Sequence, residues 1–327
     1  MIIEKLKESG LKGRSGSCFP TWVKWEAVLK AKKKVGKCFV VCNAAEGEPA
    51  VFKDKYLLET YPEEIINGIK IAIETLDAEK AFIYLRNSYF KKFKKTLEKI
   101  IGNDPIELFA ETGGYLCGEE TTLMESVVGN RNEPRIRPPF PTEAGLFGFP
   151  TLINNVETFY SVSKIEKGQY SRTRFYCISG KVKNPGVFEF PEDMPIGEIL
   201  EQTNNAPLFK YFVQVGGGAS GGIMILEELF NPVEGAASIV VYDQVETNPR
   251  DLMRKWINFY YNQNCGKCVP CREGVYRLKE MLDSEESLNL PLVRAVLNVL
   301  GQFSFCPLGK GVAFSMKSLL ERVELKK

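Results

Sequence analysis

Four cysteines near the carboxyl end of the chain have the spacing of metal ligands. Cys265, Cys268 and Cys271 are separated by two residues each, and Cys306 follows much later in the segment FSFCPLGKG. Close spacing lets one loop place three thiolates around an inorganic centre, and a distant fourth thiolate completes the coordination. Cubane iron–sulfur clusters are held by four thiolates in this way. The sequence therefore predicts a 4Fe–4S cluster, and zinc, whose four cysteines usually come as two separated pairs, is the alternative.

A glycine-rich loop near the amino terminus could bind a phosphate group. Residues 10–20 read GLKGRSGSCFP and are followed by TWVKWEAVLKAKKK, a predicted helix. The first N–H groups of a helix have no partners within the helix, and together with the helix dipole they favour an anion. The loop differs from the GxGxxG fingerprint and precedes the first predicted strand. A simple flexible turn is the alternative.

Two pairs of glutamates occupy positions where ligands are commonly bound. Glu46 and Glu48 come after the predicted strand 37–43, at the strand end where open α/β sheets bind ligands. Glu119 and Glu120 follow a glycine-rich segment and begin a predicted helix. Helix capping is one interpretation of this second pair, because the dipole favours acidic residues there, and a ligand site is the other.

A proline-rich segment, residues 135–158, could cover a planar ligand. It contains Phe140 between prolines and the amide pair Asn154 and Asn155. A rigid segment with an aromatic ring and amides suits the wall of a ligand pocket. The alternative is an ordinary rigid loop whose aromatic ring packs into the core.

The composition excludes several classes of function. The chain of 327 residues has a net charge of +2, which gives no electrostatic basis for binding nucleic acid or an anionic membrane. It contains no histidine, which excludes His-based triads and His-ligated metal sites. No apolar run approaches the ~20 residues of a spanning helix, and we expect neither a signal peptide nor direct membrane insertion. Cysteines at cluster spacing predict a reducing compartment, the cytoplasm or the cytoplasmic face of a complex.

The elements that must position these residues fall into three parts. Residues 1–168 alternate between predicted strands and helices, which indicates a parallel α/β sheet. Residues 169–245 contain short strands with one helix and predict a small α+β domain with a mixed sheet. Residues 246–327 contain four predicted helices with the cluster cysteines at their joints. A glycine run at 216–222 is interpreted as a tight connection or a close interdomain contact, with a phosphate cradle as the alternative.

Six motifs in one order give the chain a family resemblance. They are GRSGSCFPT, NAAEGEP, GGYLCGEET, EPRIRPPFP, PTLINNVET and CGKCVPCREG, the last followed by FCPLG. In this order they resemble the flavin- and NADH-binding, 51-kilodalton-type subunit of respiratory complex I. The related diaphorase subunits of NAD-linked hydrogenases and formate dehydrogenases share the pattern. The resemblance covers essentially the whole chain from residue 10.

The resemblance implies a fold and an activity. It implies a Rossmann-like domain for FMN and NADH over residues 1–168, a β-grasp (ubiquitin-like) domain over 169–245 and a helical bundle with a 4Fe–4S cluster over 246–327. In the family, NADH gives a hydride to FMN, and electrons leave singly through the cluster. A flavin performs this conversion because it accepts two electrons and releases them one at a time. The chain is therefore expected to be an oxidoreductase subunit with FMN, NAD(H) and a 4Fe–4S cluster.

The resemblance also assigns site residues, motif by motif. The positions that match flavin-binding residues are Gly13, Arg14, Gly16, Lys24, Asn43, Glu46, Gly118, Glu119, Asn154 and Asn155. The positions that match the nicotinamide nucleotide site are Phe19, Glu48, Glu120 and Phe140, of which the two glutamates are taken as the catalytic-site carboxylates. The cluster ligands are Cys265, Cys268, Cys271 and Cys306.

The first loop departs from the family pattern. It usually reads GRGGAGFP, and here the departures are Ser15, Ser17 and Cys18. Added side chains make it harder for backbone N–H groups to approach a ligand. Cys18 is interpreted as a small packing residue, with a redox role beside the flavin as the alternative.

Three further departures affect the nucleotide sites. Ala45 replaces an aspartate that hydrogen-bonds the flavin side chain in the family, and Ala27 stands where a second aromatic residue that stacks on adenine is common. Arg137 replaces a lysine, which is a change in hydrogen-bonding geometry as well as size. These departures motivate an alternative function, an electron-wiring subunit that has lost NADH binding and takes electrons from a protein donor or a partner subunit. In either case we expect other iron–sulfur subunits as partners, including a thioredoxin-like 2Fe–2S subunit.

Overall fold

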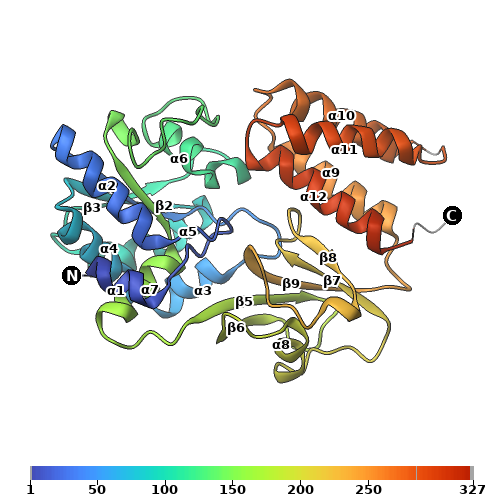
Figure 1. Cartoon of the computed structure of the whole chain (residues 1–327), viewed down its shortest axis with the longest axis horizontal. Helices are drawn as coiled ribbons and strands as arrows, with labels where there is room; N and C mark the ends of the chain where they lie inside the picture. Colours follow the sequence, from blue (N-terminus) through green and yellow to red (C-terminus); the bar gives the residue numbers. More distant parts are fainter. Residues whose placement is uncertain (1, 285, 325–327) are drawn as a thin grey trace. The chain divides into compact units, whose positions relative to one another are not determined.

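The computed structural model describes residues 2–284 and 286–324, and the chain divides into two compact units. The first consists of residues 2–47 and 52–175, and the second of residues 48–51 and 176–324. Figure 1 labels most of the helices and strands of both units. The boundaries at residues 168 and 245 expected from the sequence stay a prediction, because the division follows contacts and not evolutionary domains.

The first unit is built on a sheet of four parallel strands. They are β1 (Phe39–Ala44), β2 (Lys80–Leu85), β3 (Ile106–Ala110) and β4 (Thr151–Asn155), in the order β3-β2-β1-β4. The nearly continuous apolar runs of β1 and β2 are typical of strands that are buried on both faces. The predicted Rossmann-like parallel sheet is confirmed. The strand β4 was not expected, because its sequence TLINN was interpreted only as part of a ligand wall.

Helices cover both faces of this sheet. They are α1 (Ile2–Ser9), α2 (Thr21–Val35), α3 (Lys53–Thr60), α4 (Pro62–Leu76), α5 (Asn87–Ile101), α6 (Glu120–Val127) and α7 (Val156–Glu166), with short 3-10 turns at Tyr115–Gly118 and Leu146–Gly148. On one face, Leu123 and Met124 of α6 pack with Phe39 and Val41 of β1 in a buried cluster. The helices α4 and α7 pack against each other and against β1.

The carboxyl ends of β1 and β4 form the place where a ligand can bind. Asn43 of β1 and Asn155 of β4 are paired in the sheet register. The chain runs from β1 to β2 and β3 on one side of β1, whereas β4 lies on the other side. Open α/β sheets bind ligands at such a reversal of strand order, outside the carboxyl ends of the strands.

The second unit contains a five-stranded mixed sheet. Its strands are β5 (Thr173–Gly180), β6 (Gly186–Pro191), β7 (Tyr211–Gly216), β8 (Gly222–Met224) and β9 (Ala236–Asp243), in the order β6-β5-β9-β7-β8. The pair β5–β9 is parallel, and β7 runs antiparallel to β8 and β9. The helix α8 (Ile196–Gln202) places Ile196, Ile199 and Leu200 in the core of this sheet. The predicted mixed sheet with one helix is confirmed.

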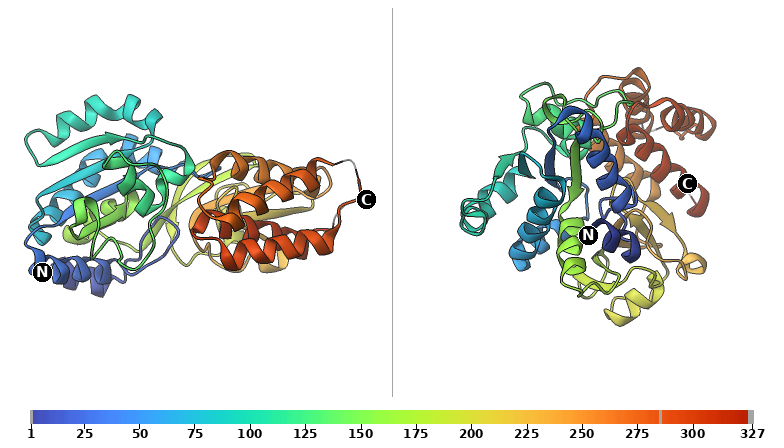
Figure 2. Two further views of the ribbon diagram at one scale, coloured as in Figure 1. Left: turned by 90° about the horizontal axis from the view of Figure 1, so that it is seen from above. Right: turned by 60° about the vertical axis from the view of Figure 1, so that its left-hand side comes forward.

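Four helices complete the second unit, and Figure 2 shows them as a bundle. They are α9 (Pro249–Gln263), α10 (Val269–Asp283), α11 (Leu290–Phe303) and α12 (Pro307–Arg322). Arg250, at the start of α9, donates hydrogen bonds to Leu282 and Met281 carbonyls at the end of α10, so these helices are antiparallel. Arg294 of α11 likewise donates to the carbonyl of Leu320 near the end of α12. The predicted helical part is confirmed.

The bundle also packs against the sheet of the second unit. The hydroxyl of Ser318 on α12 accepts a hydrogen bond from the Ile223 N–H at 2.7 Å and donates one to the Ile223 carbonyl at 3.2 Å. Helix α12 of the bundle is therefore bonded directly to β8 of the sheet. Within the described residues, none of the helices combines the length and the apolar character that crossing a membrane requires.

Candidate flavin, nucleotide and cluster sites

The glycine-rich loop folds as a closed excursion before α2. The Gly13 N–H donates to the Phe19 carbonyl at 2.8 Å, and the Thr21 N–H donates to the Leu11 carbonyl at 3.0 Å. These bonds fix the two ends of the loop, while Ser15 and Ser17 between them are exposed. The loop is thus a turn with fixed ends, and its role in binding a phosphate stays a prediction.

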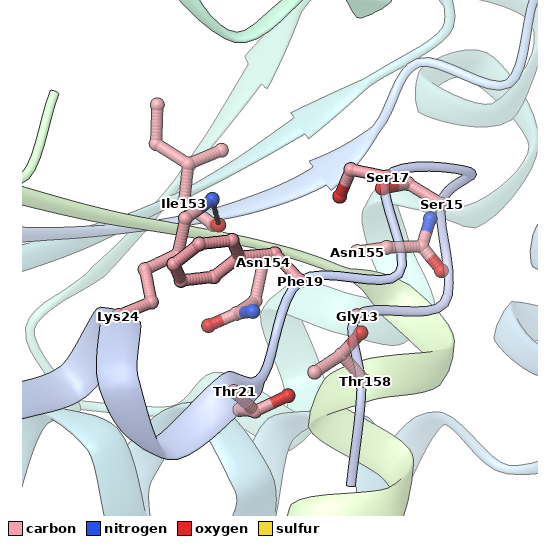
Figure 3. Close-up of a pocket in the computed structure, with 10 residues that line it drawn as sticks. All are labelled: Gly13, Ser15, Ser17, Phe19, Thr21, Lys24, Ile153, Asn154, Asn155 and Thr158. Atoms are coloured by element: carbon pink, nitrogen blue, oxygen red, sulfur yellow. Dashed lines mark hydrogen bonds between the residues drawn. The ribbon is translucent and has the colours of Figure 1, made fainter. Parts of the chain in front are cut away.

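Residues of this loop and of the β4–α7 joint surround one pocket (Figure 3). Its lining consists of Gly13, Ser15, Ser17, Phe19, Thr21, Lys24, Ile153, Asn154, Asn155 and Thr158. Five of these positions, namely Gly13, Phe19, Lys24, Asn154 and Asn155, were assigned to the flavin or nucleotide site from the sequence. The structure thus brings together residues from two motifs that are far apart in the chain.

The pocket offers hydrogen-bond donors to an anionic or polar ligand. Helix α2 begins at the pocket, and its N-cap residue, Pro20, provides no side-chain cap. The Thr21 hydroxyl is buried, and no described residue pairs with it. Asn154 accepts a hydrogen bond from the Trp25 indole at 3.2 Å through Oδ1, which leaves its Nδ2 as a donor. An uncapped helix start beside an unpaired buried hydroxyl fits a phosphate or a polyhydroxyl chain.

Arg14 connects the loop to residues 158–173 through hydrogen bonds. Its backbone N–H donates to the Thr158 hydroxyl at 3.0 Å. Its buried guanidinium donates to the Tyr170 hydroxyl at 2.7 Å and to the Thr173 carbonyl at 3.3 Å. The side chain therefore secures the loop in this structure, and its contact with a flavin stays a prediction.

The residues beside the pocket are joined by amide side chains. Asn43 donates to the Gly118 carbonyl at 2.9 Å and accepts from the Ala45 N–H at 3.1 Å. A side chain at Gly118 would meet the Ala45 carbonyl oxygen at 3.0 Å, which explains the glycine there. Asn155 donates to Asp54 at 2.7 Å, which connects the end of β4 to α3.

A buried network of charged groups lies next to Asn155. The Lys53 ammonium lies 2.6 Å from an Asp54 oxygen and 3.1 Å from a Glu157 oxygen. Glu46 accepts hydrogen bonds from the Asp54 N–H at 2.9 Å and from the Tyr89 hydroxyl at 2.8 Å. Two buried carboxylates, Asp54 and Glu157, thus pair with one ammonium, and the third, Glu46, interacts with it electrostatically. Burial, reinforced by the negative charge of Asp54, raises the pKa of Glu46 to about 7.

The same network acts on the pKa values of Lys53 and Asp54. Burial alone would lower the pKa of Lys53, but the carboxylates of Asp54, Glu157 and Glu46 raise it above its ordinary value. Burial raises the pKa of Asp54 despite its bonds to Lys53 and Asn155. Lys53 is therefore the firmly charged member, and the carboxyl groups hold the titratable proton.

Glu120 lies between two cations at the edge of the pocket. Its carboxylate is 3.1 Å from the Lys24 ammonium and 2.7 Å from an Arg137 nitrogen. Lys24 also donates to the Ile153 carbonyl at 2.9 Å. Arg137 reaches Glu119 as well, at 3.3 Å. Because a guanidinium presents several donors, one arginine orients both glutamates.

Glu119 is the N-cap of α6. Its carboxylate accepts hydrogen bonds from the backbone N–H groups of Thr121 at 3.1 Å and Thr122 at 2.8 Å. The capping interpretation is confirmed for Glu119. It does not apply to Glu120, whose carboxylate pairs with side chains, so the ligand role of Glu120 stays a prediction.

Phe140 and Phe19 are both exposed aromatic rings. Their exposed fractions are 50% and 47%, and Phe19 lines the pocket. The alternative in which Phe140 packs into the core is therefore wrong. An exposed ring is available to stack on a planar ligand, although Phe140 is not among the pocket-lining residues drawn in Figure 3.

In the second unit, the cluster cysteines lie at two helix joints. Cys265 and Cys268 lie between α9 and α10, Cys271 lies in the first turn of α10, and Cys306 is the N-cap of α12. Cys268 is the N-cap of α10. Thiolates are favoured at helix starts, where N–H groups and the dipole stabilise negative charge.

The four thiols are close enough to influence one another. Burial, followed by the neighbouring Cys268, Cys306 and Cys265, raises the pKa of Cys271 to about 12. Across the described chain, no three His, Cys, Asp or Glu side chains are gathered as ligands of a single metal ion. A side chain at Gly309, in the first turn of α12, would meet Ser304 and would lie 3.3 Å from the Cys271 Cβ.

Ser304 adds an unpaired donor at the cysteine site. It is 4% exposed, and its hydroxyl finds no partner among the residues of known placement. Its neighbours Gly309 and Cys271 put it beside the thiols. A hydrogen-bond donor in this position fits an iron–sulfur cluster, whose sulfur atoms accept hydrogen bonds.

Glu48 belongs to the second unit, unlike the other assigned nucleotide residues. One carboxylate oxygen, Oε1, accepts hydrogen bonds from the backbone N–H groups of Ala219 and Ser220, each at 2.9 Å. The glycine run at 216–222 thus holds a carboxylate. It is not simply a tight connection.

Sequence reasoning missed five residues of the pocket. They are Ser15, Ser17, Thr21, Ile153 and Thr158. Ser15 and Ser17 were treated only as departures from a glycine pattern. Thr21 and Thr158 lie inside the motifs GRSGSCFPT and PTLINNVET, and their hydroxyl groups beside assigned residues were a signal that could have identified them.

Comparison with known proteins identifies matching regions in both units. Residues 6–164 match the family model of the Nuo51 FMN-binding domain. Residues 175–203 match the SLBB domain, and residues 251–324 match the NADH-ubiquinone oxidoreductase-F iron-sulfur binding region. The last match contains all four assigned cysteines.

Individual relatives agree with these matches. An F subunit of the NADH-quinone oxidoreductase of Rhizobium meliloti is 33% identical over 98% of this chain and 86% of its own length. The corresponding F subunit of Streptomyces coelicolor is 33% identical over 98% of this chain and 80% of its own length. A chain in the crystal structure of an NAD+-reducing NiFe hydrogenase in the H2-reduced state superposes with a TM-score of 0.90 at 31% identity. That match covers 98% of this chain but 61% of the hydrogenase chain.

Proposed function

The chain belongs to the family of the F subunits of NADH-quinone oxidoreductase, the NADH-oxidising flavin and iron–sulfur subunits, and we propose which of its residues carry each part of that task. The observation that carries the proposal is the pocket at the carboxyl ends of β1 and β4. It is lined by the residues that two separate family motifs contribute.

The pocket residues fit the polar part of FMN. The uncapped start of α2 and the Thr21 hydroxyl provide donors for the phosphate and ribityl chain. Asn154 and the exposed serines, Ser15 and Ser17, add polar groups along the same wall. When bound, FMN supplies the conversion of a two-electron hydride into single electrons.

The residues at the edge of the pocket fit the nicotinamide nucleotide. Phe19 is exposed and can stack on a planar ring. Glu120, fixed by Lys24 and Arg137, is a hydrogen-bond acceptor with a defined orientation. A carboxylate accepts hydrogen bonds, and the hydroxyl and amide groups of the nucleotide can donate them. Its family motif assigns Glu48, which belongs to the second unit, to the nucleotide as well.

The cysteines fit the 4Fe–4S cluster of the family. Cys268 and Cys306 present thiolates at helix starts, and Ser304 adds a donor. The zinc alternative is not favoured, because the matching family region is an iron–sulfur binding region.

The alternative function, an electron-wiring subunit without NADH binding, is also not favoured. Its motivation was the set of departures at Cys18, Ala27, Ala45 and Arg137. Arg137 in fact orients Glu119 and Glu120 and so takes over a positioning task. The relatives are named as NADH-quinone oxidoreductase subunits.

Partners and compartment extend beyond these findings. The chain belongs to a family of subunits of multi-subunit redox complexes. We propose a thioredoxin-like 2Fe–2S subunit as the neighbour, because electrons that leave the cluster need an acceptor. The cytoplasm, at the face of a membrane complex where one is present, stays a prediction.

The test is a spectroscopic titration of the purified chain under anaerobic conditions. After reconstitution with FMN, iron and sulfide, NADH is added while the visible spectrum is recorded. We expect loss of the oxidised flavin band followed by reduction of the cluster. A flavin that dithionite reduces but NADH does not would overturn the proposal and return the electron-wiring alternative.

A further inference from the structure

Backbone N–H groups of the glycine run at 216–222 bind the segment 48–51. In addition to the two bonds to Glu48, the Gly218 N–H donates to the Pro49 carbonyl at 2.7 Å. Three consecutive N–H groups, from Gly218 to Ser220, therefore bind two consecutive residues. Successive backbone N–H groups in such a loop form an anion-binding concavity.

The glycines of the run are required by this contact. A Cβ at Gly217 would lie 2.5 Å from Oε1 of Glu48, and the residue has a φ of +127°. A Cβ at Gly218 would lie 2.6 Å from the Pro49 carbonyl oxygen. A β-carbon at either position would clash with an oxygen of the segment 48–51. Glycine at both positions therefore allows Glu48 and Pro49 to approach the backbone of the run.

The segment itself adopts a conformation that needs support. Ala50 has a φ of 61°, in the left-handed region that non-glycine residues seldom occupy. Such a conformation persists where surrounding contacts determine it. The bonds from the glycine run to Glu48 and Pro49 are those contacts, together with the Val51 N–H, which donates to the Glu48 carbonyl at 3.2 Å.

The geometry leaves half of the Glu48 carboxylate available. Oε1 accepts both N–H groups, whereas Oε2 accepts no hydrogen bond from the described part of the chain. A carboxylate fixed through one oxygen keeps a defined direction for the other. This arrangement suits a residue that must accept a hydrogen bond from a ligand without first losing rotational freedom.

We propose that Gly217, Ala219 and Ser220 are positioning residues that fix Glu48 for the nicotinamide nucleotide. The inference rests on the function of Glu48 given above and extends it to a glycine run that none of the family motifs contains. The backbone of the run acts on the nucleotide only through Glu48.

The test compares two glycine variants in two backgrounds. Gly217→Ala introduces a methyl group against Glu48, and Gly216→Ala is the matched control. Gly216 also has a positive φ, +95°, but a Cβ there would meet Glu234 and Gly221 and nothing in the segment 48–51. Each change is made in the natural chain and in a Glu48→Ala chain. The melting temperature of the flavin-free protein and the Kd of the FMN-loaded protein for NAD+ are measured.

We expect Gly217→Ala to weaken NAD+ binding about tenfold in the natural chain, as for loss of hydrogen bonds to a charged group. In the Glu48→Ala chain the same change should alter the Kd less than about twofold, because its partner is gone. The melting temperature should show the same coupling, and Gly216→Ala should show none. If Gly217→Ala does not fold, Glu48→Asp tests the same bonds, since it withdraws the carboxylate from both N–H groups and should also weaken NAD+ binding.

The outcomes separate this inference from the proposed function. Additive effects of Gly217→Ala and Glu48→Ala on the melting temperature would overturn the positioning role, whatever the NAD+ affinity. Coupled melting temperatures with an unchanged Kd in the Glu48→Ala chain would show that Glu48 does not contact the nucleotide. That result would overturn the inference together with the role of Glu48, but not the flavin and cluster assignments.

Discussion

The Tyr89 hydroxyl lies 2.8 Å from Oε2 of Glu46 and donates a hydrogen bond to it inside the first unit. This bond and the Asp54 N–H stabilise the carboxylate, yet burial and the nearby negative charge of Asp54 prevail and raise the pKa of Glu46 to about 7. The residue is 6% exposed, so water does not compensate for the missing solvation. A buried carboxyl group two residues after β1 thus has a pKa of about 7.

The first prediction concerns stability against pH. The folded state holds the Glu46 proton more tightly than the unfolded state, whose pKa is near 4.5. Stability from this group is complete below pH 4.5 and is lost as the pH rises toward 7, because the unfolded state releases the proton first. Glu46→Gln mimics the protonated acid. We expect it to remove this loss, which is roughly 3 kcal/mol for such a shift, when unfolding by urea is followed from pH 4.5 to 8.

Glu26→Gln is the matched control for this experiment. Glu26 is exposed on α2, and its replacement should leave the slope of stability against pH unchanged. An unchanged slope in Glu46→Gln would show that the proton resides elsewhere in the network, with Asp54 as the remaining raised carboxyl group.

The second prediction concerns Cys18, which has a φ of 49°. A non-glycine residue in this left-handed region costs about 1–2 kcal/mol, and the family pattern has glycine at this position. Glycine also loses more chain entropy on folding, so the net gain from Cys18→Gly should be about 0.5–1 kcal/mol in the free energy of unfolding. Cys18→Ser keeps the β-carbon and should give no such gain.

The same pair of variants tests the redox interpretation of Cys18. If the thiol has a redox role, both variants should resist the effect of oxidants on turnover of the reconstituted protein. If Cys18 is only a packing residue, oxidants should affect all three proteins equally.

The third prediction concerns the unpaired hydroxyl of Ser304. A donor to the sulfur atoms stabilises the more negative, reduced cluster, so its removal should lower the reduction potential. For Ser304→Ala we expect a decrease of about 60 mV, which for one electron corresponds to roughly 1.4 kcal/mol. The midpoint potential is measured by a redox titration followed by electron paramagnetic resonance.

Ser315→Ala is the control for the cluster potential. Ser315, in α12, is buried like Ser304, but its hydroxyl donates to the Gly311 carbonyl at 3.1 Å within its own helix. Its removal should leave the potential unchanged. Equal potentials in Ser304→Ala and the natural chain would mean that the Ser304 hydroxyl does not reach the cluster.

The sequence predicted best where the local pattern is strong. Cys265, Cys268 and Cys271 are separated by fixed intervals and lie at the joints of predicted helices, so the cluster joint could be located without coordinates. The strand Phe39–Ala44 is an apolar run bounded by polar loops and was expected at residues 37–43, within two residues of its bounds. These features depend on neighbours in the chain.

The sequence predicted least where the determining contact is distant. The strand β4 contains TLINN, whose two amides hide the strand pattern until pairing with β1 buries it. The run was expected to make a tight connection or a close interdomain contact, but its partner Glu48 could not be identified because it lies about 170 residues before Ala219 and Ser220. Glu119 and Glu120 are adjacent, yet Glu119 caps a helix and Glu120 pairs with Lys24. This difference depends on where the fold places Lys24, which is distant in the chain, so the sequence could not predict it.

The antiparallel arrangement of α9 and α10 separates two kinds of fastening. At one end, Arg250 ties α9 to the carbonyls that finish α10, and this tie is independent of metal. At the other end, Cys265 and Cys268 leave the loop dependent on an inorganic cross-link to Cys306. The cluster would therefore join the α9–α10 loop to the start of α12, whereas the opposite ends of both hairpins are held by arginine contacts. We expect loss of the cluster to loosen the cysteine end of the bundle first, because the arginine contacts at the opposite end do not depend on metal.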